Sequence, residues 1–203
     1  MKKIAVLLLA CAILSIVAAV FLPSLKNDFV NWDDDRYVIE NNLIKSLSLG
    51  NIKNIFTTFY MGNYHPLTIL SYALDYRFFK LRPFGYHLTN LLLHLSNCIF
   101  TFSVIYMLSR SLPVAFIAAI LFGLHPLQVD SVAWVSERKG LLCAAFYLCA
   151  IIAYIRYASK NQESKYYYLS LLFLTFALLS KPMAVTLPFV LLPQELMPWR
   201  SFQ

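Results

Sequence analysis

Long apolar segments alternate with short polar ones along this chain. The first apolar segment runs from Ile4 to Leu22, directly after the basic pair Lys2-Lys3. A helix of about 20 apolar residues can cross a bilayer, and basic residues before it favour an N-terminus in the cytoplasm. The pattern therefore predicts an uncleaved membrane anchor. Cleavage after Ala18-Ala19, as in a secretory signal, is the alternative.

Further apolar segments follow a long polar stretch, at Tyr86–Leu108, Leu112–Leu124, Leu141–Ala158, Tyr166–Ser180 and Met183–Leu192. Several are shorter than a straight span needs, which is tolerated where the backbone faces protein or a wet cavity. The pattern predicts an all-α fold, a polytopic transmembrane helical bundle of about five to six membrane segments with a long first outer loop. We expect a single membrane domain over residues 1–203, with a first span at 4–22, the outer loop at 23–82 and the remaining segments at 86–192.

Two places in the loop Pro23–Arg82 carry apolar residues at helical spacing. Such spacing predicts two short amphipathic helices along the membrane surface. Pro66 would separate them, because proline breaks a helix that precedes it. The apolar positions are Ile52, Ile55, Phe56 and Phe59 in the first helix, and Leu67, Leu70, Leu74 and Phe78 in the second.

Composition supports a membrane protein and excludes a nucleic-acid-binding one. Hydrophobic residues make up 60% of the chain and charged residues 13%, which is more apolar surface than a soluble domain of this size buries. The net charge is +7, but the basic residues mostly flank apolar segments, an arrangement that suits lipid headgroups. The four cysteines show no CxxC pair or Cys/His ligand spacing, so neither a disulfide framework nor a zinc site is expected.

The basic residues also predict an orientation. With Lys2-Lys3 inside, alternation of spans places Pro23–Arg82 outside and the basic loop Ser159–Lys165 inside. The same alternation places Arg138-Lys139 and Lys181 outside, against the usual rule. A cation in that position suggests a phosphate ligand. The alternative for Lys181 is that its ammonium group simply reaches the lipid headgroups.

Three carboxylates stand together in Trp32-Asp33-Asp34-Asp35-Arg36, shortly after the first span. Because neighbouring carboxylates repel one another, such a run needs a cation, a hydroxyl partner or open solvent. One Asp can cap a short helix, but three exceed what a cap requires. The alternative is a general base or a metal ligand at the outer membrane face, and the spacing does not tell which Asp would act.

Polar residues also follow one stripe of the segment Tyr86–Leu108. A polar stripe on an apolar helix either forms hydrogen bonds between helices or lines a cavity. If it lines a cavity, His87 lies nearest the outer face. The stripe consists of His87, Asn90, His94, Asn97 and Thr101.

A second group of ionisable residues, which includes His125, Asp130 and Glu137, lies at a predicted membrane boundary. Asp130 could begin a short helix, with Trp134 in the interfacial aromatic belt. Alternatively, Asp130 and Glu137 share one helix face and add acids to the outer site, while Arg138 and Lys139 hold an anionic headgroup.

Taken in order, these motifs resemble the membrane part of bacterial tetratricopeptide-repeat membrane proteins. That part is similar to the eukaryotic transmembrane and tetratricopeptide-repeat O-mannosyltransferases. The resemblance covers about residues 1 to 193. Its motifs are Trp32-Asp33-Asp34-Asp35-Arg36, Asn63-Tyr64-His65-Pro66-Leu67, Gly85-Tyr86-His87-Leu88-Thr89-Asn90, Leu124-His125-Pro126 with Asp130, and Leu178-Leu179-Ser180-Lys181-Pro182.

The resemblance implies a GT-C-like glycosyltransferase in a multi-pass membrane protein, expected in the bacterial inner membrane with its site on the extracytoplasmic side. Such a protein transfers a sugar from a polyprenyl-phosphate carrier to an acceptor that can be a protein. Members of the family continue into further spans and a soluble repeat array, whereas this chain ends at Gln203 without a helical repeat. It thus resembles a truncated copy, and a non-catalytic membrane scaffold or lipid-binding and partner-binding remnant is the alternative function.

The resemblance also assigns candidate site residues. It places the first-loop acid on the Asp run and the acid of the second outer loop on Asp130. Together with the residues at the membrane boundary described above, the resemblance gives a set of candidate residues for binding the substrate and the lipid phosphate. No cofactor is certain, and a divalent metal would use Asp34 and Asp130. The candidates are Asp33, Asp34, Asp35 and Asp130 for catalysis, and His87, His125, Arg138 and Lys181 for binding.

Overall fold

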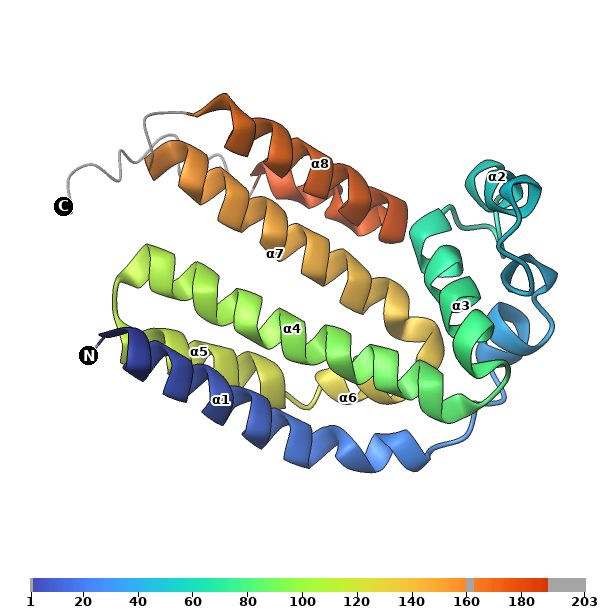
Figure 1. Ribbon diagram of the computed structural model, residues 1–203, viewed down its shortest axis with the longest axis horizontal. Coiled ribbons are helices and arrows are strands. Elements are labelled where there is room, and N and C mark those ends of the chain that lie inside the picture. Colours follow the sequence, from blue (N-terminus) through green and yellow to red (C-terminus); the bar gives the residue numbers. More distant parts are fainter. Residues whose placement is uncertain (1, 160–162, 190–203) are drawn as a thin grey trace.

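The computed structural model describes residues 2–159 and 163–189, and this part of the chain is helical, with no β-strand. The predicted all-α class is therefore confirmed. Three helices are long and apolar enough to cross a membrane. They are α1 (Lys2–Phe21), α4 (Pro83–Ser109) and α7 (Arg138–Ser159) (Figure 1).

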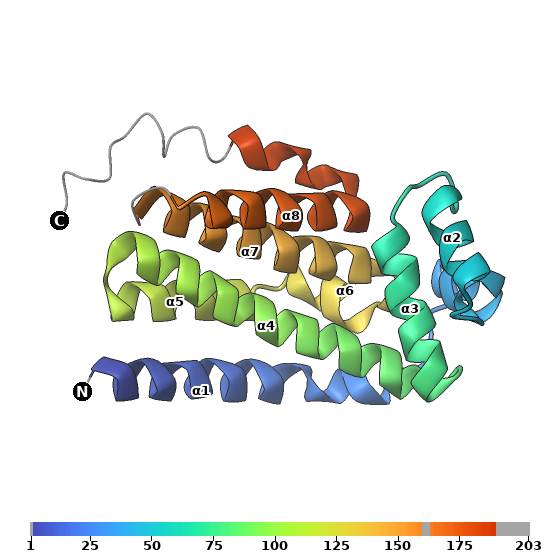
Figure 2. The same cartoon turned by 45° about the horizontal axis from the view of Figure 1, so that its top comes forward.

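Two shorter helices accompany these candidate spans. Helix α5 (Leu112–Leu124) packs on α4, and α8 (Ser164–Ser180) packs on α7 (Figures 1 and 2). The predicted sixth segment begins in a short 3-10 turn, η5 (Pro182–Thr186), and its residues 190–192 lie outside the described part. Among the described residues, three helices are thus candidate spans by length and composition, and the predicted total of five to six remains a prediction.

The connections between the helices lie at the two ends of the bundle (Figure 1). The start of α1 lies at the same end as the α4–α5 connection, the last turn of α7 and the first turn of α8, and the polar region between α1 and α4 covers the opposite end (Figure 1). Arg110 ends α4, and Arg156 lies in the last turn of α7. These cations gather at the N-terminal end, as expected for a cytoplasmic face. The orientation of the bundle in a membrane remains a prediction.

The polar region folds into short helices that cover the opposite end (Figure 2). Ser48 caps the first turn of α2 by accepting a hydrogen bond from the Asn51 amide. Pro66 is the first residue of α3, where a missing amide hydrogen does no harm. The elements are the 3-10 turn η1 (Leu22–Lys26), the π-helical turn η2 (Asp35–Ile39), the 3-10 turn η3 (Asn42–Ile44), α2 (Leu49–Thr57) and α3 (Pro66–Phe79).

The covering region has an apolar core of its own. Tyr37, Ile44 and Tyr72 are completely or almost completely buried, and they pack with Tyr86 of α4 and Val135 of the segment before α7. Residues that precede α4 in the sequence and a residue that follows it therefore share one core. The outer loop is consequently a folded part of the domain that is fixed to the end of the bundle.

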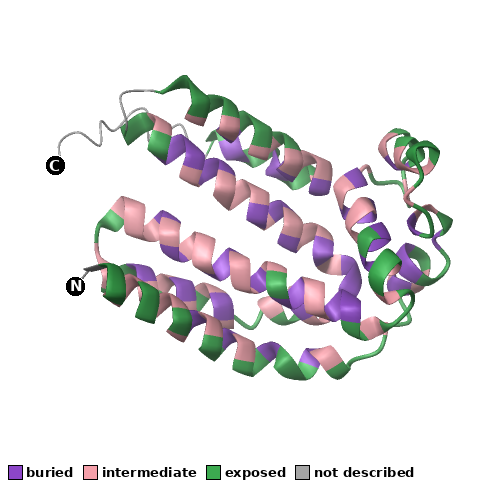
Figure 3. Cartoon of the chain, viewed as in Figure 1, coloured by how far each residue is buried: buried purple, intermediate pink, exposed green. Residues whose placement is uncertain are grey.

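The apolar core of the bundle lies between α1, α4 and α5. Its buried members include Val17 of α1, Cys98 of α4 and Ala119 of α5. The opposite face of α1 is largely exposed, as Figure 3 shows along the whole helix. Exposed leucines and valines on a helix of this length are typical of contact with lipid.

The polar stripe of α4 joins helices to one another. His94 Nε2 lies 3.0 Å from the carbonyl oxygen of Gly123 in α5, and Asn97 Nδ2 donates to the carbonyl oxygen of Leu141 in α7 at 3.0 Å. Both side chains are fully buried. Of the two alternatives for the stripe, hydrogen bonding between helices is the one that these two residues adopt.

Close packing at Gly123 yields a prediction about the stability of the bundle. A Cβ atom at Gly123 would lie 2.8 Å from Cys98 Sγ and 2.8 Å from Val17 Cγ2, both in the buried core. We expect Gly123→Ala to lower the free energy of unfolding by about 1–3 kcal/mol, because overpacking forces neighbours to shift. Unfolding in mixed detergent micelles measures it.

Gly50→Ala is the matched control. A Cβ atom at Gly50 of α2 would meet no heavy atom within 4 Å, and alanine favours a helix over glycine by about 1 kcal/mol. The control should leave stability unchanged or raise it. Equal behaviour of the two variants would contradict the close approach of α1, α4 and α5.

Candidate functional site

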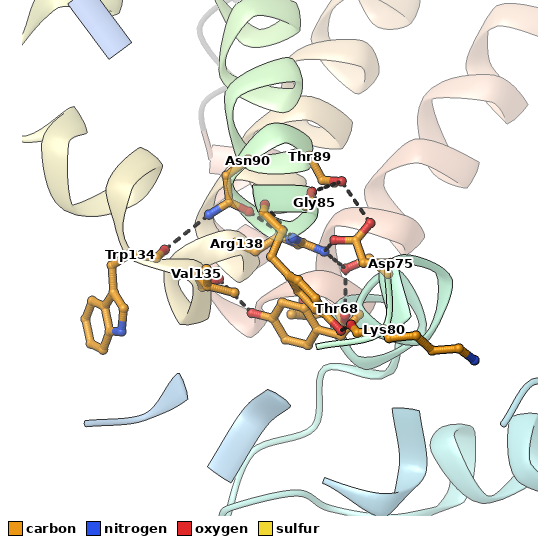
Figure 4. Close-up of polar contacts among 12 residues, drawn as sticks. Thr68, Asp75, Lys80, Gly85, Thr89, Asn90, Trp134, Val135 and Arg138 are labelled. Carbon is orange, nitrogen blue, oxygen red and sulfur yellow. Dashed lines mark hydrogen bonds and ion pairs between the residues drawn. The ribbon is translucent and has the colours of Figure 1, made fainter. Parts of the chain in front are cut away.

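A fully buried cation lies where α3, α4 and α7 meet. Arg138 Nη1 lies 2.6 Å from Asp75 Oδ2 of α3, and the arginine side chain is 0% exposed. Its Nε donates to Asn90 Oδ1 at 2.8 Å, and its Nη2 donates to the carbonyl oxygen of Tyr86 at 2.8 Å (Figure 4). The guanidinium thus has partners on two other helices. These partners compensate for the hydration that the buried guanidinium has lost, a loss that would otherwise be very unfavourable in the interior.

Neighbouring groups complete the environment of this cation. The guanidinium carbon lies 4.6 Å from the ring centroid of Tyr72, which suits a cation–π contact. Thr89 donates a hydrogen bond to Asp75 Oδ1 at 2.8 Å. Asn90 donates to the carbonyl oxygen of Trp134 at 3.2 Å (Figure 4). Together these contacts hold α3, α4 and the start of α7 against one another.

The middle acid of the Asp run is part of a second internal connection. Asp34 is 0% exposed. Its Oδ1 accepts the Ser136 amide at 2.9 Å and also the Ser136 hydroxyl, and its Oδ2 accepts the Val30 amide at 3.0 Å. Asp34 therefore joins the first loop to the 3-10 turn η4 (Val135–Glu137), which leads into α7.

Asp33 and Asp35 flank this anchor and are half-buried. The Asp33 carboxylate lies close enough to Tyr37 to affect it, since burial and Asp33 together raise the pKa of the Tyr37 hydroxyl above its usual value. The ring of His65 lies 5.4 Å from that of Tyr37. Asp33, Tyr37 and His65 thus lie on one side of the first loop.

Two lysines, Lys139 and Lys181, lie close to Glu137, and Lys139 also lies close to Tyr37. Lys139 Nζ lies 5.4 Å from the Tyr37 ring centroid and 3.2 Å from Glu137 Oε1. Lys181 Nζ lies 3.4 Å from Glu137 Oε2. Both lysines are partly exposed. The outer site, defined here as Asp33, Tyr37, His65, Glu137, Lys139 and Lys181, combines two acids, a phenol, an imidazole and two cations from four parts of the chain.

Electrostatics in the outer site keep His65 neutral. The imidazole is 4% exposed. Burial, and then the positive charge of Lys139, lower the pKa of His65 to about 4. At neutral pH the ring carries no charge. It can therefore take part in a hydrogen bond without adding a third cation to the site.

The structure brings together some of the residues predicted from the sequence and separates others. Lys181 lies in the outer site, and His87 is fully buried within electrostatic range of Asp34. Arg138 was expected at a surface that faces headgroups, yet it is completely buried and its donors are occupied within the protein. His125 and Asp130 are exposed around the start of α6 (Gln128–Ala133).

The sequence also contained a signal that our interpretation missed. Asp75 is the only acidic residue between Glu40 and Asp130, which sets it apart in an otherwise apolar and basic stretch. An isolated acid beside apolar residues indicates a buried partner of opposite charge. Ser136 and Tyr37 carried no comparable signal, because serine and tyrosine occur commonly at loop boundaries.

A divalent metal remains a prediction. Among residues 2–159 and 163–189, no group of three or more His, Cys, Asp and Glu side chains is arranged to hold a metal ion. Both carboxylate oxygens of Asp34 already accept hydrogen bonds from the protein. A metal on Asp34 would have to displace donors that now hold the loop, so we derive no step through a metal.

Comparison with known proteins shows similarity to enzymes of one kind. The chain is 32% identical over 165 residues to protein O-mannosyl-transferase TMTC3 of Mus musculus, which is 75% of this chain and 17% of that protein. It is 31% identical over 190 residues to protein O-mannosyl-transferase Tmtc1 of Drosophila melanogaster, which is 88% of this chain and 21% of that protein. The predicted similarity to this group is confirmed.

The similarity concerns only a part of those relatives. The match with protein O-mannosyl-transferase Tmtc3 of Drosophila melanogaster, at 34% identity over 114 residues, covers 46% of this chain but 12% of the relative. The chain thus spans about a fifth or less of the length of these curated relatives. No family model matches the chain, and no solved structure matches it.

The buried ion pair yields a prediction about stability. Asp75→Asn keeps the shape of the side chain but removes the charge that faces Arg138. We expect the free energy of unfolding to fall by about 3–5 kcal/mol, because an unpaired cation would be left in the interior. Arg77→Gln, which removes an exposed charge two residues away, should change it by no more than about 0.5 kcal/mol. Similar small effects in both variants would show that Arg138 has another counterion.

The lowered pKa of His65 predicts how stability depends on pH. The pKa of a histidine in an unfolded chain is about 6.5, whereas His65 in the folded protein has a pKa of about 4. As the pH falls from 6.5 to 4, the unfolded chain takes up a proton that the folded protein does not. This histidine therefore stabilises the fold above pH 6.5, and that contribution, up to about 3 kcal/mol, is lost towards pH 4.

The variant His65→Gln isolates this effect from the titration of carboxylates. Unfolding free energies of the original protein and of the variant are compared between pH 7 and pH 4.5. The original protein should lose more stability over this range. Parallel pH profiles would show that His65 has an ordinary pKa.

Proposed function

We propose that this chain forms the membrane region of a glycosyltransferase that moves mannose from a polyprenyl-phosphate carrier to a hydroxyl group of a protein. The proposed fold is GT-C-like, and the proposed site is the outer site at the extracytoplasmic end of the bundle. We also propose a bacterial inner membrane as the location. Because the relatives are several times longer, any activity of the whole protein is part of this proposal.

The contact between Asp34 and Ser136 is the observation that carries the proposal. It holds the acid run against the segment that contains Glu137 and Lys139. An acid and cations from distant parts of the sequence are thereby fixed in one place. Transfer of a sugar from a lipid phosphate needs this combination, a base for the acceptor and positive charge for the leaving phosphate.

In this proposal Asp33 is the general base. Its carboxylate takes the proton of the acceptor hydroxyl while the hydroxyl oxygen attacks the anomeric carbon of the sugar. The bond from that carbon to the phosphate oxygen breaks, and the lipid phosphate leaves with both bonding electrons. Asp34 is a positioning residue, because its two oxygens are engaged by Ser136 and Val30. Asp35 is the other candidate for the base.

Cations would stabilise the leaving phosphate. Lys181 and Lys139 are partly exposed and share Glu137 as counterion, so an arriving phosphate can replace Glu137 as their partner. Arg138 would act from the interior by holding α3 and α7 in place. The exposed residues Asp130 and His125 are proposed contacts to the acceptor or the sugar.

His87 has a proposed role behind the acid run. Its ring is buried in the first turns of α4, within electrostatic range of Asp34. We assign it to support of the loop that carries Asp33. Direct contact with the substrate would require the loop to move.

One observation favours a second function. Glu137 already pairs with Lys139 and with Lys181, so each lysine has an acidic partner within the protein. A non-catalytic scaffold that only binds lipids or partner helices would have the same closed network. The two functions differ in whether Asp33 is required for anything beyond folding.

Substitution of single acids tests the proposed reaction. In membranes that contain the protein, transfer of mannose from a polyprenyl-phosphate donor to protein should fall by about 10²–10⁴-fold in Asp33→Asn, because a general base contributes about that much. The melting temperature should stay unchanged. Asp28→Asn, an exposed acid of the same loop, is the control and should keep activity.

Asp34→Asn should behave differently from Asp33→Asn. It weakens the bonds that hold Ser136, so we expect loss of both folded protein and transfer. If transfer survives in Asp33→Asn and in Asp35→Asn, the base lies elsewhere and the scaffold becomes the better account.

A further inference from the structure

A basic pocket lies outside the outer site, between α3 and the segment that follows η3. Its volume is about 360 Å³. Lys45, Arg77 and Lys80 line it together with the hydroxyl-bearing residues Ser46 and Tyr76. The pocket therefore combines three cations with two hydroxyl groups, which suits a phosphate group.

These cations lack acidic partners. Among the described residues, no ion pair includes Lys45, Arg77 or Lys80. Lys45 Nζ donates to Asn42 Oδ1 at 3.0 Å, and Lys80 Nζ lies 5.1 Å from the ring centroid of Tyr76. Lys139 and Lys181 share Glu137 as an acidic partner, whereas none of these three side chains has an ion-pair partner among the described residues.

The backbone fixes the position of Lys80. Its φ of +55° is unusual for a residue with a side chain. The Lys80 amide donates to the carbonyl oxygen of Tyr76 at 3.0 Å, and its own carbonyl oxygen accepts the Tyr86 hydroxyl at 2.9 Å. The pocket is thus anchored to α4, the helix that begins three residues later at Pro83.

An apolar surface adjoins the pocket. Phe78, in the last turn of α3, is 77% exposed, and Phe84, in the first turn of the candidate span α4, is 49% exposed. Leu74 of α3 and Leu81, which lies between the two helices, are exposed as well. Large exposed apolar side chains beside cations, at the start of a span, are typical of the boundary between headgroups and hydrocarbon.

We propose that this pocket binds the phosphate of an anionic phospholipid headgroup in the adjacent leaflet. Arg77 and Lys80 hold the phosphate, Lys45 closes the pocket from the loop, and Phe78 and Phe84 contact the acyl chains. The lipid would fix α3 at the membrane surface. This inference is independent of the proposed transfer reaction, because none of these residues belongs to the outer site.

Binding of phosphatidylglycerol to the purified protein tests the proposal. The protein is held in neutral detergent micelles, and native mass spectrometry measures the apparent Kd for the lipid. Loss of one cation near a membrane surface weakens binding by about fivefold. The double variant Arg77→Gln, Lys80→Gln should therefore bind more than tenfold more weakly. If this variant does not fold, Lys45→Gln alone, which removes an exposed charge, should still weaken binding.

Two controls separate the pocket from general surface charge. Lys53→Gln removes an exposed cation of α2, and Arg82→Gln removes an exposed cation next to the pocket that does not line it. Both should change the apparent Kd by less than about twofold. Equal losses in Arg82→Gln and in the pocket variants would overturn the site.

Two further probes identify the source of the phosphate. Phosphatidylcholine has the same acyl chains without net negative charge and should bind more weakly than phosphatidylglycerol. Glycerol phosphate has the anion without acyl chains and should not compete at the same concentration. Binding of phosphatidylcholine as tight as that of phosphatidylglycerol would overturn the role of charge. Competition by glycerol phosphate at lipid-like concentrations would overturn the assignment to a lipid.

Discussion

The fold depends on how it accommodates one arginine. A guanidinium removed from water loses several kcal/mol of hydration, which only well-placed partners restore. Arg138 obtains these partners from α3 through Asp75 and from α4 through Asn90 and a backbone carbonyl. The three elements can therefore come together in only one way that leaves no charge unpaired.

This constraint extends from the interior to the outer site. With α3 fixed, Tyr72 donates a hydrogen bond to the carbonyl oxygen of Val135, and Thr68 donates to the carbonyl oxygen of Ser180. The turn that contains Val135 also contains Ser136, which holds Asp34. Ser180 directly precedes Lys181. The acid run and the lysines are consequently positioned by internal contacts.

The helices of the bundle could be predicted closely from the sequence, whereas the outer site could not. Helix α5 covers the predicted range Leu112–Leu124, and α4 (Pro83–Ser109) extends the predicted range Tyr86–Leu108 by three residues at its start and one at its end. The agreement is close because the length of an apolar segment determines a membrane helix directly. Arg138 and Lys139 are neighbours in sequence, yet one is buried and the other faces the site. That difference depends on Asp75, a partner on another helix, and no local pattern reveals it. The interpretation of the site as glycosyltransferase-like came from the resemblance of the ordered motifs, which the similarity to the O-mannosyl-transferases supports.

A double-mutant cycle between Asp75 and Arg138 tests the central claim most directly. Unfolding free energies are measured for the original protein, for Asp75→Asn, for Arg138→Gln and for the double variant. Residues in direct contact show coupling energies of about 0.5–3 kcal/mol, and a buried ion pair at 2.6 Å should lie in the upper half of that range. A coupling energy near zero, with the two losses simply adding, would contradict the account.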